Sequence, residues 1–384
     1  MITCTNCGCG YPSRGLPYQC PKCGGLFDFA VLPDFDPARA APAQPGIWRW
    51  RHAFGLPADA EPVSLGEGNT PLVPAQAFGR DVFFKCEYQN PTGSFKDRGS
   101  ALIAAWLKLR GRKEAVEDSS GNAGASFAAY AARAGIRARI FVPASASGPK
   151  RTQIEAYGAD LVPVPGSRSD VAEAVRRAAG GKAAYASHAW LPFNLPGYAT
   201  AAYEIFEQLG GRLPGAVIVP AGQGGFLLGL RRGFEQLRIA RNLSDDPTIT
   251  NNQTVTDNQT LIDSQTSVVK MVGVQARACA PLWALFTAGR EGLGFVAENA
   301  TLAEGVRVRQ PLRGAAVLGA VAAGCGSVCA ADEEEILPGR EALARLGFYV
   351  EPTSAIVWSA LRQTIHEFPD PVVVVLTGSG LKYG

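Results

Sequence analysis

The chain contains the run Asn90-Pro91-Thr92-Gly93-Ser94-Phe95-Lys96-Asp97-Arg98-Gly99. Lys96 follows a Pro/Gly turn and precedes an apolar stretch that predicts a helix over residues 101–109. A lysine amine held between a loop and an apolar helix can be partly desolvated, which favours its neutral, nucleophilic form. That form condenses with an aldehyde. The same residues are equally compatible with an ordinary helix N-terminus whose charges are solvated.

The composition is that of a soluble globular protein with more than one core. Of its 384 residues, 47% are hydrophobic and 18% are charged, and this length predicts two subdomains plus a small accessory piece. The net charge of +3 is too small to favour nucleic acid or a membrane surface. No apolar run reaches the roughly 20 residues that a spanning helix needs. The nine cysteines are scattered as free thiols usually are, and no signal-peptide core is present, so we expect a cytoplasmic protein. With only three histidines, catalysis centred on histidine is not favoured.

Short apolar segments alternate with helical patterns along most of the chain. Strands are predicted at residues 82–85, 138–142, 160–164, 215–220, 271–275 and 372–376. Helices are predicted at residues 123–134, 150–157, 170–179, 200–209, 226–237 and 352–367. This alternation indicates βαβ units and an α/β fold with a mainly parallel, covered sheet. Ligands of such sheets bind at the carboxyl ends of the strands.

Residues 1–29 contain two Cys-x-x-Cys pairs, Cys4 with Cys7 and Cys20 with Cys23, separated by twelve residues. Four thiolates on two tight turns can enclose a tetrahedral zinc ion. The separation is slightly shorter than the usual zinc pattern, and Cys9 is a spare thiol that could compete as a ligand. A piece of about 25 residues has too little core to fold without such a staple. We therefore expect a structural zinc ribbon.

The ten-residue run at Lys96 resembles the cofactor-lysine motif of the fold type II pyridoxal-phosphate enzymes, threonine synthases above all. The resemblance implies that Lys96 carries pyridoxal 5'-phosphate covalently and removes the α-proton of the substrate. It also implies two three-layer αβα subdomains with mainly parallel sheets, in a catalytic domain over residues 63–384. The smaller subdomain, at about residues 98–190, would be inserted in the larger one. Cysteine-rich ribbons precede the catalytic domain of many threonine synthases, and a homodimer is expected of the family.

Ser119-Ser120-Gly121-Asn122 precede an alanine-rich helix. Hydroxyls and backbone amides at a helix start form either an anion site or simply a good N-cap. The resemblance implies that Ser119, Ser120 and Gly121 hold the substrate carboxylate. It places Asn122 against the phenolic oxygen of the cofactor.

Gly222-Gln223-Gly224-Gly225-Phe226 follow a predicted strand and open a helix. Glycines let the backbone approach a phosphate, and the helix dipole favours its charge, whereas the spacing does not match a dinucleotide fingerprint. In the family, such a turn binds the cofactor phosphate. Threonine synthases usually show an asparagine after the glycines, so this run is more similar to that of serine/threonine dehydratases.

Thr377-Gly378-Ser379-Gly380-Leu381-Lys382 close the last predicted strand. The run resembles the threonine-synthase ending, in which a hydroxyl faces the pyridine nitrogen, and it implies this role for Thr377 first and Ser379 second. A neutral hydroxyl there would make the cofactor a milder electron sink, suited to elimination and replacement. The alternative is a plain glycine-rich turn.

Lys150-Arg151-Thr152-Gln153 matches the family's Lys-x-x-Gln segment, near which a phosphate leaving group would be received. Lysine and arginine suit a phosphate, although a solvated helix face fits nearly as well. The family's Asn-Ser-x-Asn-Pro-x-Arg segment should fall at residues 188–194, where this chain reads His-Ala-Trp-Leu-Pro-Phe-Asn. Two polar anchors and the arginine are missing, which weighs against O-phosphohomoserine as substrate but not against the cofactor.

Two segments lie outside these motifs. Residues 30–62 are rich in proline and alanine and are expected to form a linker. Residues 242–269 are expected to form a polar surface insertion with a six-residue repeat, extended or disordered, for which no catalytic part is expected; the alternative is a small β-rich edge.

The resemblance as a whole implies a pyridoxal-phosphate-dependent lyase of the threonine-synthase group. Such an enzyme converts O-phosphohomoserine and water to threonine and phosphate by γ-elimination and β-addition of water. Its partner would be an amino-acid substrate, with no nucleic acid and no membrane. Two alternatives stay open: a serine/threonine dehydratase or related ammonia-lyase, favoured by the glycine turn and the missing arginine, and a catalytically silent homologue that binds the cofactor.

Overall fold

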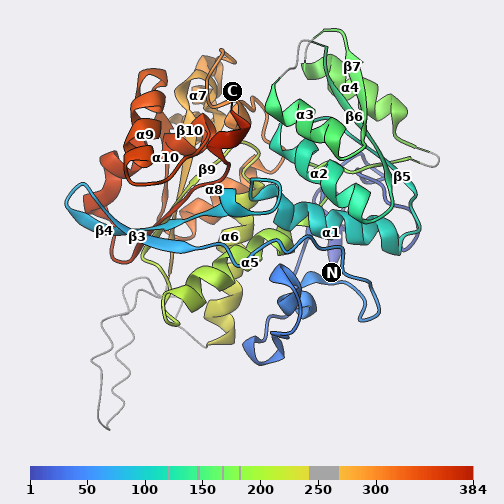
Figure 1. Ribbon diagram of the computed structural model, residues 1–384, viewed down its shortest axis with the longest axis horizontal. Coiled ribbons are helices and arrows are strands. Elements are labelled where there is room, and N and C mark those ends of the chain that lie inside the picture. The colour runs from blue at the N-terminus through green and yellow to red at the C-terminus, as the bar shows by residue number, and fades with distance from the viewer. Residues whose placement is uncertain (120, 145–147, 167, 181–182, 242–267, 384) are drawn as a thin grey trace. The chain divides into compact units, whose positions relative to one another are not determined.

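The computed structural model describes residues 1–119, 121–144, 148–166, 168–180, 183–241 and 268–383 (Figure 1). Ser120 and almost all of the polar insertion expected at residues 242–269 lie outside the described residues. The chain divides into two compact units. The first comprises Met1–Asn69, Glu87–Thr200 and Gly378–Gly384, and the second comprises Thr70–Cys86 and Ala201–Thr377. The smaller subdomain expected at about residues 98–190 falls within the first unit.

The first unit is built on a four-stranded parallel sheet in the order β7–β6–β5–β8. The strands are β5 (Glu114–Glu117), β6 (Arg137–Pro143), β7 (Asp160–Val164) and β8 (Ala183–Tyr185). The helices are α1 (Lys96–Leu109), α2 (Asn122–Arg133), α3 (Pro149–Ala156), α4 (Arg168–Ala178) and the first half of α5 (Asn194–Gln208).

Alternation along β6 shows which helices cover each face of this sheet. Ile140 and Val142 are buried with Phe127 of α2 in one apolar cluster. Phe141, which lies between them in the chain, is buried in a second cluster with Val171 of α4. The first unit is therefore layered as helix, sheet and helix.

The second unit contains a six-stranded sheet in the order β11–β10–β9–β12–β4–β3. Its strands are β3 (Leu72–Ala77), β4 (Arg80–Lys85), β9 (Ala216–Pro220), β10 (Lys270–Ala276), β11 (Ser327–Ala331) and β12 (Val372–Val375). Neighbouring strands are parallel except in the β3–β4 hairpin, which confirms the predicted mainly parallel sheets. The helices are α6 (Gly225–Ala240), α7 (Pro281–Gly292), α8 (Gly314–Ala322), α9 (Glu333–Arg345) and α10 (Pro352–Thr364).

Each predicted strand and helix has a counterpart in the structure. The observed bounds differ from the predicted ones, and several elements were not predicted. Helix α1 begins at Lys96 and α5 at Asn194, in both cases before the predicted start. In α5, Pro196 stands in the first turn, where proline is compatible with a helix. Pro338 inside α9 obscures that helix in the sequence, and β8 has only three residues. The elements that the sequence missed are β1–β3, β5, β8, β11 and α7–α9.

The stretch expected to be a linker contributes to the core of the first unit. Within it, a 3₁₀ segment spans Gly46–Phe54, and Trp48 is buried against α1 and α2. The indole of Trp48 donates a hydrogen bond of 3.0 Å to Glu67, and the Tyr130 hydroxyl donates one of 2.7 Å to the same carboxylate. Burial raises the pKa of Glu67, whereas hydrogen bonds from the Leu65 backbone and the Tyr130 hydroxyl lower it. Glu67 thus fastens residues 46–67 to α2, a role that the sequence did not reveal.

The N-terminal residues form a small hairpin of β1 (Ile2–Cys4) and β2 (Phe27–Phe29), paired antiparallel. Aromatic side chains dock it on the first unit. Tyr11 contacts Phe193 with ring centroids 5.2 Å apart, and Tyr18 contacts Tyr185 at 5.0 Å and Trp190 at 5.6 Å. Among the helices that the structure describes, none is both long and apolar enough to cross a bilayer.

Candidate active site

Lys96 is the first residue of α1, and buried interactions fix the loop before it. The Arg98 guanidinium donates two hydrogen bonds of 2.7 Å, one to each carboxylate oxygen of Glu87. Asn90 donates to Glu87 at 3.0 Å, and the Thr92 backbone donates to Asp97 at 2.7 Å. These groups are almost wholly buried. The loop that presents Lys96 is therefore pre-organised, as a reacting group requires.

The C-terminal segment lies against the same loop. Ser379 donates its backbone N–H to the carbonyl of Gly93 at 3.0 Å, and the Lys382 ammonium donates to the carbonyl of Thr92 at 2.8 Å. The structure therefore brings Ser379, a predicted site residue, next to the lysine loop. Its hydroxyl accepts a hydrogen bond of 3.2 Å from the backbone of Leu381.

Thr377, the first choice for the pyridine nitrogen, belongs to the second unit. Its hydroxyl is buried and lies 3.0 Å from the hydroxyl of Ser354 on α10. The Ser354 hydroxyl can donate to Thr377, which then keeps its own proton for another acceptor. This arrangement is compatible with the predicted role and does not test it.

Two other lysines are engaged by buried acceptors. The Lys85 ammonium, which is fully buried, donates to the Thr70 carbonyl at 2.7 Å, to Glu204 at 2.7 Å and to Gln208 at 2.9 Å. These three bonds use all three of its protons and favour the charged form, which is not nucleophilic. Lys382 is largely buried and engaged by Thr92. Both amines are therefore poorly suited to condense with an aldehyde.

The turn after β5 places Ser119, Gly121 and Asn122 at the carboxyl end of the strand and the start of α2. Gly121 donates its backbone N–H to the hydroxyl of Ser119 at 3.2 Å. Gly124 packs so closely on this turn that a Cβ there would overlap the carbonyl oxygen of Ser119. Ser120 lies outside the described residues, so its predicted role stays a prediction.

Replacing Gly124 with alanine should disrupt this turn. The added methyl group meets backbone, which cannot rotate away as a side chain can, and overpacking of this kind costs about 1–3 kcal/mol. We expect the affinity for cofactor to fall at least about tenfold in G124A, measured by spectroscopic titration of the cofactor-free protein. Gly319→Ala is the control, because Gly319 also lies in a helix and a Cβ there would meet no atom within 4 Å. An unchanged affinity in G124A would show that the turn takes no part in cofactor binding.

The glycine turn of the second unit connects β9 to α6. Gly224 has φ of +75°, and a Cβ there would collide with Val317. A Cβ on Gly222 would lie 2.8 Å from the carbonyl oxygen of Gly305. The side-chain carbonyl of Gln223 accepts a hydrogen bond of 3.0 Å from the Leu312 backbone, and Phe226 is buried. Both glycines are thus required by packing.

This turn has the properties of a phosphate cradle. No side chain of the described residues caps the N-terminus of α6, so its first N–H groups remain suited to an anion. The bare backbone at residues 222–225 also allows close approach. The donor set fits the phosphate of pyridoxal phosphate.

Lys150 and Arg151 lie on the first turn of α3. The Arg151 guanidinium pairs with Glu155 at 3.5 Å, an exposed i,i+4 pair that contributes little to stability. Gln153, from the same motif, donates to the Thr92 carbonyl at 3.1 Å and so ties α3 to the lysine loop. The predicted phosphate contacts of Lys150 and Arg151 remain predictions.

Sequence reasoning missed a buried polar chain beside the lysine. Ser126 of α2 donates to Asp97 at 2.6 Å, Ser100 lies 2.6 Å from Ser126, and Nε2 of His188 lies 3.0 Å from Ser100. Burial raises the pKa of Asp97, against the hydrogen bonds of Ser126 and Thr92. Burial, and next the charge of Lys96, lower the pKa of His188 well below its ordinary value. The one sequence signal for this polar chain was that His188 stands where the resembled family has polar anchors.

The four cysteines of the two Cys-x-x-Cys pairs come together as predicted. Their sulfurs all lie within 4.8 Å of one another, with Cys4 3.5 Å from Cys23 and Cys7 3.7 Å from Cys20. Zinc–sulfur bonds of about 2.3 Å put tetrahedral sulfurs about 3.8 Å apart, close to these separations. Cys9 is not part of this group.

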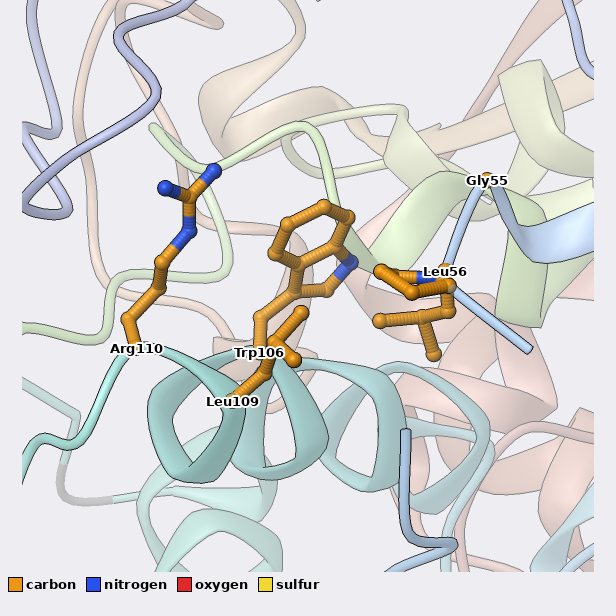
Figure 2. A pocket seen from close by; sticks show the side chains of 6 residues that line it. Gly55, Leu56, Trp106, Leu109 and Arg110 are labelled. Carbon is orange, nitrogen blue, oxygen red and sulfur yellow. The ribbon is translucent and has the colours of Figure 1, made fainter. Parts of the chain in front are cut away.

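A cavity of about 640 Å³ lies beside the far end of α1. Figure 2 shows Trp106, Leu109 and Arg110 on one side of it and Gly55 and Leu56 on the other. Trp106 is ten residues beyond Lys96, which is about 15 Å along a helix. This cavity is therefore separate from the lysine loop.

Comparison with known proteins places these features in a family. The family profile described as pyridoxal-phosphate dependent enzyme matches residues 63–378. The chain is 30% identical to the threonine synthase of Methanocaldococcus jannaschii, over 99% of this chain and 92% of the relative. It is 32% identical to the threonine synthase of Synechocystis sp., over 92% of this chain and 88% of the relative.

Solved structures agree on the fold. The crystal structure of a threonine deaminase from T.th. superimposes with a TM-score of 0.64 at 25% identity, over 82% of this chain and 94% of that one. Maize serine racemase superimposes with a TM-score of 0.65 at 22% identity, over 82% and 89%. The second likeness bears on the fold alone.

Proposed function

The chain belongs to the family of pyridoxal-phosphate-dependent enzymes, and from that premise we propose that it is a threonine synthase, which converts O-phosphohomoserine and water to threonine and phosphate. The observation that carries the proposal is the similarity to proteins named threonine synthase, at 30% identity over 99% of this chain. The fold of the resembled group, its lysine run and its cysteine pairs support it.

The proposal gives each predicted residue one task. Lys96 binds the cofactor covalently and later takes the proton from the substrate α-carbon. Ser119, Ser120 and Gly121 bind the substrate carboxylate, and Asn122 holds the cofactor's phenolic oxygen. Residues 222–226 bind the phosphate. When bound, pyridoxal phosphate supplies the electron sink for the carbanion.

Thr377 is the preferred partner of the pyridine nitrogen, with Ser379 second. The order follows the resemblance, because both hydroxyls can accept a hydrogen bond, Thr377 from Ser354 and Ser379 from the Leu381 backbone, and keep a proton for the ring nitrogen. A hydroxyl cannot stabilise a protonated ring nitrogen as a carboxylate does, which favours elimination and replacement. Lys150 and Arg151 are proposed to receive the leaving phosphate.

A serine/threonine dehydratase is the second candidate. It is favoured by the segment at residues 188–194, which lacks the arginine and two polar anchors of the resembled motif. The deciding experiment measures the products from O-phosphohomoserine, L-serine and L-threonine. A threonine synthase releases phosphate and threonine from the first substrate only. Ammonia and a 2-oxo acid from serine or threonine, with no turnover of O-phosphohomoserine, would replace the proposal with the dehydratase, and binding of cofactor without any turnover would indicate the silent homologue.

We also propose that Cys4, Cys7, Cys20 and Cys23 bind one structural zinc ion. The support is the sulfur geometry and the very small core of the hairpin, which consists chiefly of Cys4, Cys20 and Phe27. A four-thiolate site leaves no position for water and therefore has no catalytic task.

Chelation of this metal should loosen residues 1–29 while the cofactor stays bound, because the binding energy of such a site is folding energy. The measurements are metal content per chain, limited proteolysis of the N-terminus and the absorbance of the bound cofactor. Cys20→Ser should reproduce the chelator's effect, whereas Cys9→Ser, in the same hairpin, should keep about one zinc per chain. Negligible zinc in protein purified without added metal would refute the metal site. Loss of the cofactor upon chelation would refute a purely structural role.

A homodimer and a cytoplasmic location also belong to the proposal. Their support is the resemblance to the family and, for the location, the free-thiol cysteines. Light scattering of the purified protein measures the oligomeric state directly.

A further inference from the structure

The buried polar chain beside Lys96 determines the protonation pattern of His188. Asp97 accepts on both oxygens, from the Thr92 hydroxyl at 2.5 Å and the Ser126 hydroxyl at 2.6 Å on Oδ1, and from the Thr92 backbone on Oδ2. With Asp97 ionised, Ser126 donates its one proton to Asp97, so Ser100 donates to Ser126. Ser100 has then no proton left, so Nε2 of His188 must donate to Ser100.

The other ring nitrogen of His188 is consequently an acceptor in the neutral imidazole. The ring is almost wholly buried, and no hydrogen-bond donor among the described residues reaches Nδ1. The carboxylate oxygen Oε1 of Glu117 lies 3.7 Å from it, beyond hydrogen-bond range. Nδ1 of His188 is thus a buried acceptor that no described donor reaches, beside a carboxylate oxygen, and this is costly unless a water molecule donates to it.

This pair stands between two elements of the proposed site, all within the first unit. Glu117 also accepts a hydrogen bond from the backbone N–H of Ser119, in the turn proposed to hold the substrate carboxylate. The serine chain ends at Asp97, the residue after Lys96. The charges that act on the ring are Lys96 from α1 and Asp118 from the end of β5.

We propose that Nδ1 of His188 and Oε1 of Glu117 together bind the water molecule that the hydration step consumes, which makes His188 a water-positioning residue. The inference rests on the proposed function. One water has two hydrogens, and acceptors 3.7 Å apart can each receive one of them at ordinary hydrogen-bond lengths of about 2.8 Å. The lone pairs of the water oxygen are then turned away from the two acceptors.

The burial of His188 supports this assignment. Desolvation and the charge of Lys96 lower the pKa of His188, against the opposing effect of Asp118, so Nδ1 stays free of a proton near neutral pH. A protonated Nδ1 would donate and could not receive the hydrogen of a water. The serine chain is what fixes the ring in the required tautomer.

The test uses the ratio of two products made from O-phosphohomoserine. With water at the β-carbon, the product is threonine and phosphate. When no water adds at the β-carbon, the carbon skeleton is released after phosphate is lost. One water then hydrolyses it to 2-oxobutanoate and ammonia, so both routes consume one water. Because both products are made by the same enzyme in the same reaction, a general loss of folded protein lowers both and leaves their ratio unchanged.

In His188→Gln, the glutamine amide can still donate to Ser100, but no acceptor remains at the Nδ1 position. We expect the ratio of 2-oxobutanoate to threonine to rise at least about tenfold, as loss of one buried hydrogen bond predicts. Glu117→Gln should raise it similarly, because its amide can occupy Nδ1. His366→Gln, an exposed histidine of the second unit, is the control and should leave the ratio unchanged. Threonine from the wild-type protein with an unchanged ratio in H188Q would overturn the water assignment alone, whereas no threonine from the wild type would overturn the proposed function and the assignment with it.

A spectroscopic measurement is independent of turnover. Long-range ¹H–¹⁵N correlation of ¹⁵N-histidine-labelled holoenzyme has only three histidines to resolve, and H188Q identifies the signals of His188. We expect a neutral ring with its proton on Nε2, and loss of that tautomer preference in Ser100→Ala. A neutral ring with its proton on Nδ1 would overturn the assignment.

Discussion

Lys96→Ala should abolish turnover and the absorbance band of the lysine-bound cofactor, while the fold is retained. Alanine has no amine with which to form the covalent link, and a positioned proton-transfer group alone contributes about 10²–10⁴-fold to rate. We therefore expect a loss of kcat of at least that size, measured with saturating cofactor and substrate. The loop that carries Lys96 is fixed by the buried Arg98–Glu87 pair, whereas the Lys85 ammonium donates to three acceptors.

Lys108→Ala is a matched control, because Lys108 lies near the end of the same helix and its pairing with Glu61 is exposed to solvent. It should change kcat by less than about twofold, since exposed pairs contribute about 0–1 kcal/mol to stability and lie away from the chemistry. Borohydride reduction of the wild-type protein followed by peptide mapping should label Lys96. A label on Lys85 or Lys382 would show that the assignment is wrong.

Glu87→Gln should be among the most destabilising substitutions in the first unit. Both partners of the Arg98–Glu87 pair are fully buried, and Arg98 also donates to the Thr200 hydroxyl at 2.9 Å. Neutralising Glu87 leaves the Arg98 charge without a counter-charge in the interior, which costs about 3–5 kcal/mol in the free energy of unfolding. Because Asn90 and Arg98 flank the lysine loop, we also expect weaker cofactor binding.

Asp160→Asn removes the partner of Arg137 in a pair of the same chemistry that is exposed to solvent. We expect a change of only about 0–1 kcal/mol for it. Urea denaturation of the two variants and the wild type, in cofactor-free form, measures the contrast. If the two variants lost equal stability, the buried pair would not be what holds the lysine loop.

Local patterns in the sequence were sufficient for the features that depend on neighbouring residues. Such features are the run at Lys96, the paired cysteines and the glycine turn before α6. In each, a backbone conformation or a ligand determines which residue types can stand within a few positions. Gly224 shows this well: its left-handed φ and its contact with Val317 both demand the absence of a Cβ. The strand and helix alternation likewise predicted the parallel sheets, because buried parallel strands are continuous apolar runs.

Only the tertiary structure revealed the features that join distant parts of the chain. Asp97, Ser100, Ser126 and His188 lie on three separate segments, and their sequence spacing carries no pattern. The same holds for Glu67, which joins Trp48 to Tyr130, and for the docking of Tyr18 on Trp190. A hydrogen bond between residues far apart in the chain is set by the packing of helices and strands, whereas a turn or a metal pair is set by bond geometry along a few residues. That physical difference is why the sequence alone determined the family motifs and the tertiary structure decided which polar side chains surround Lys96 within its unit.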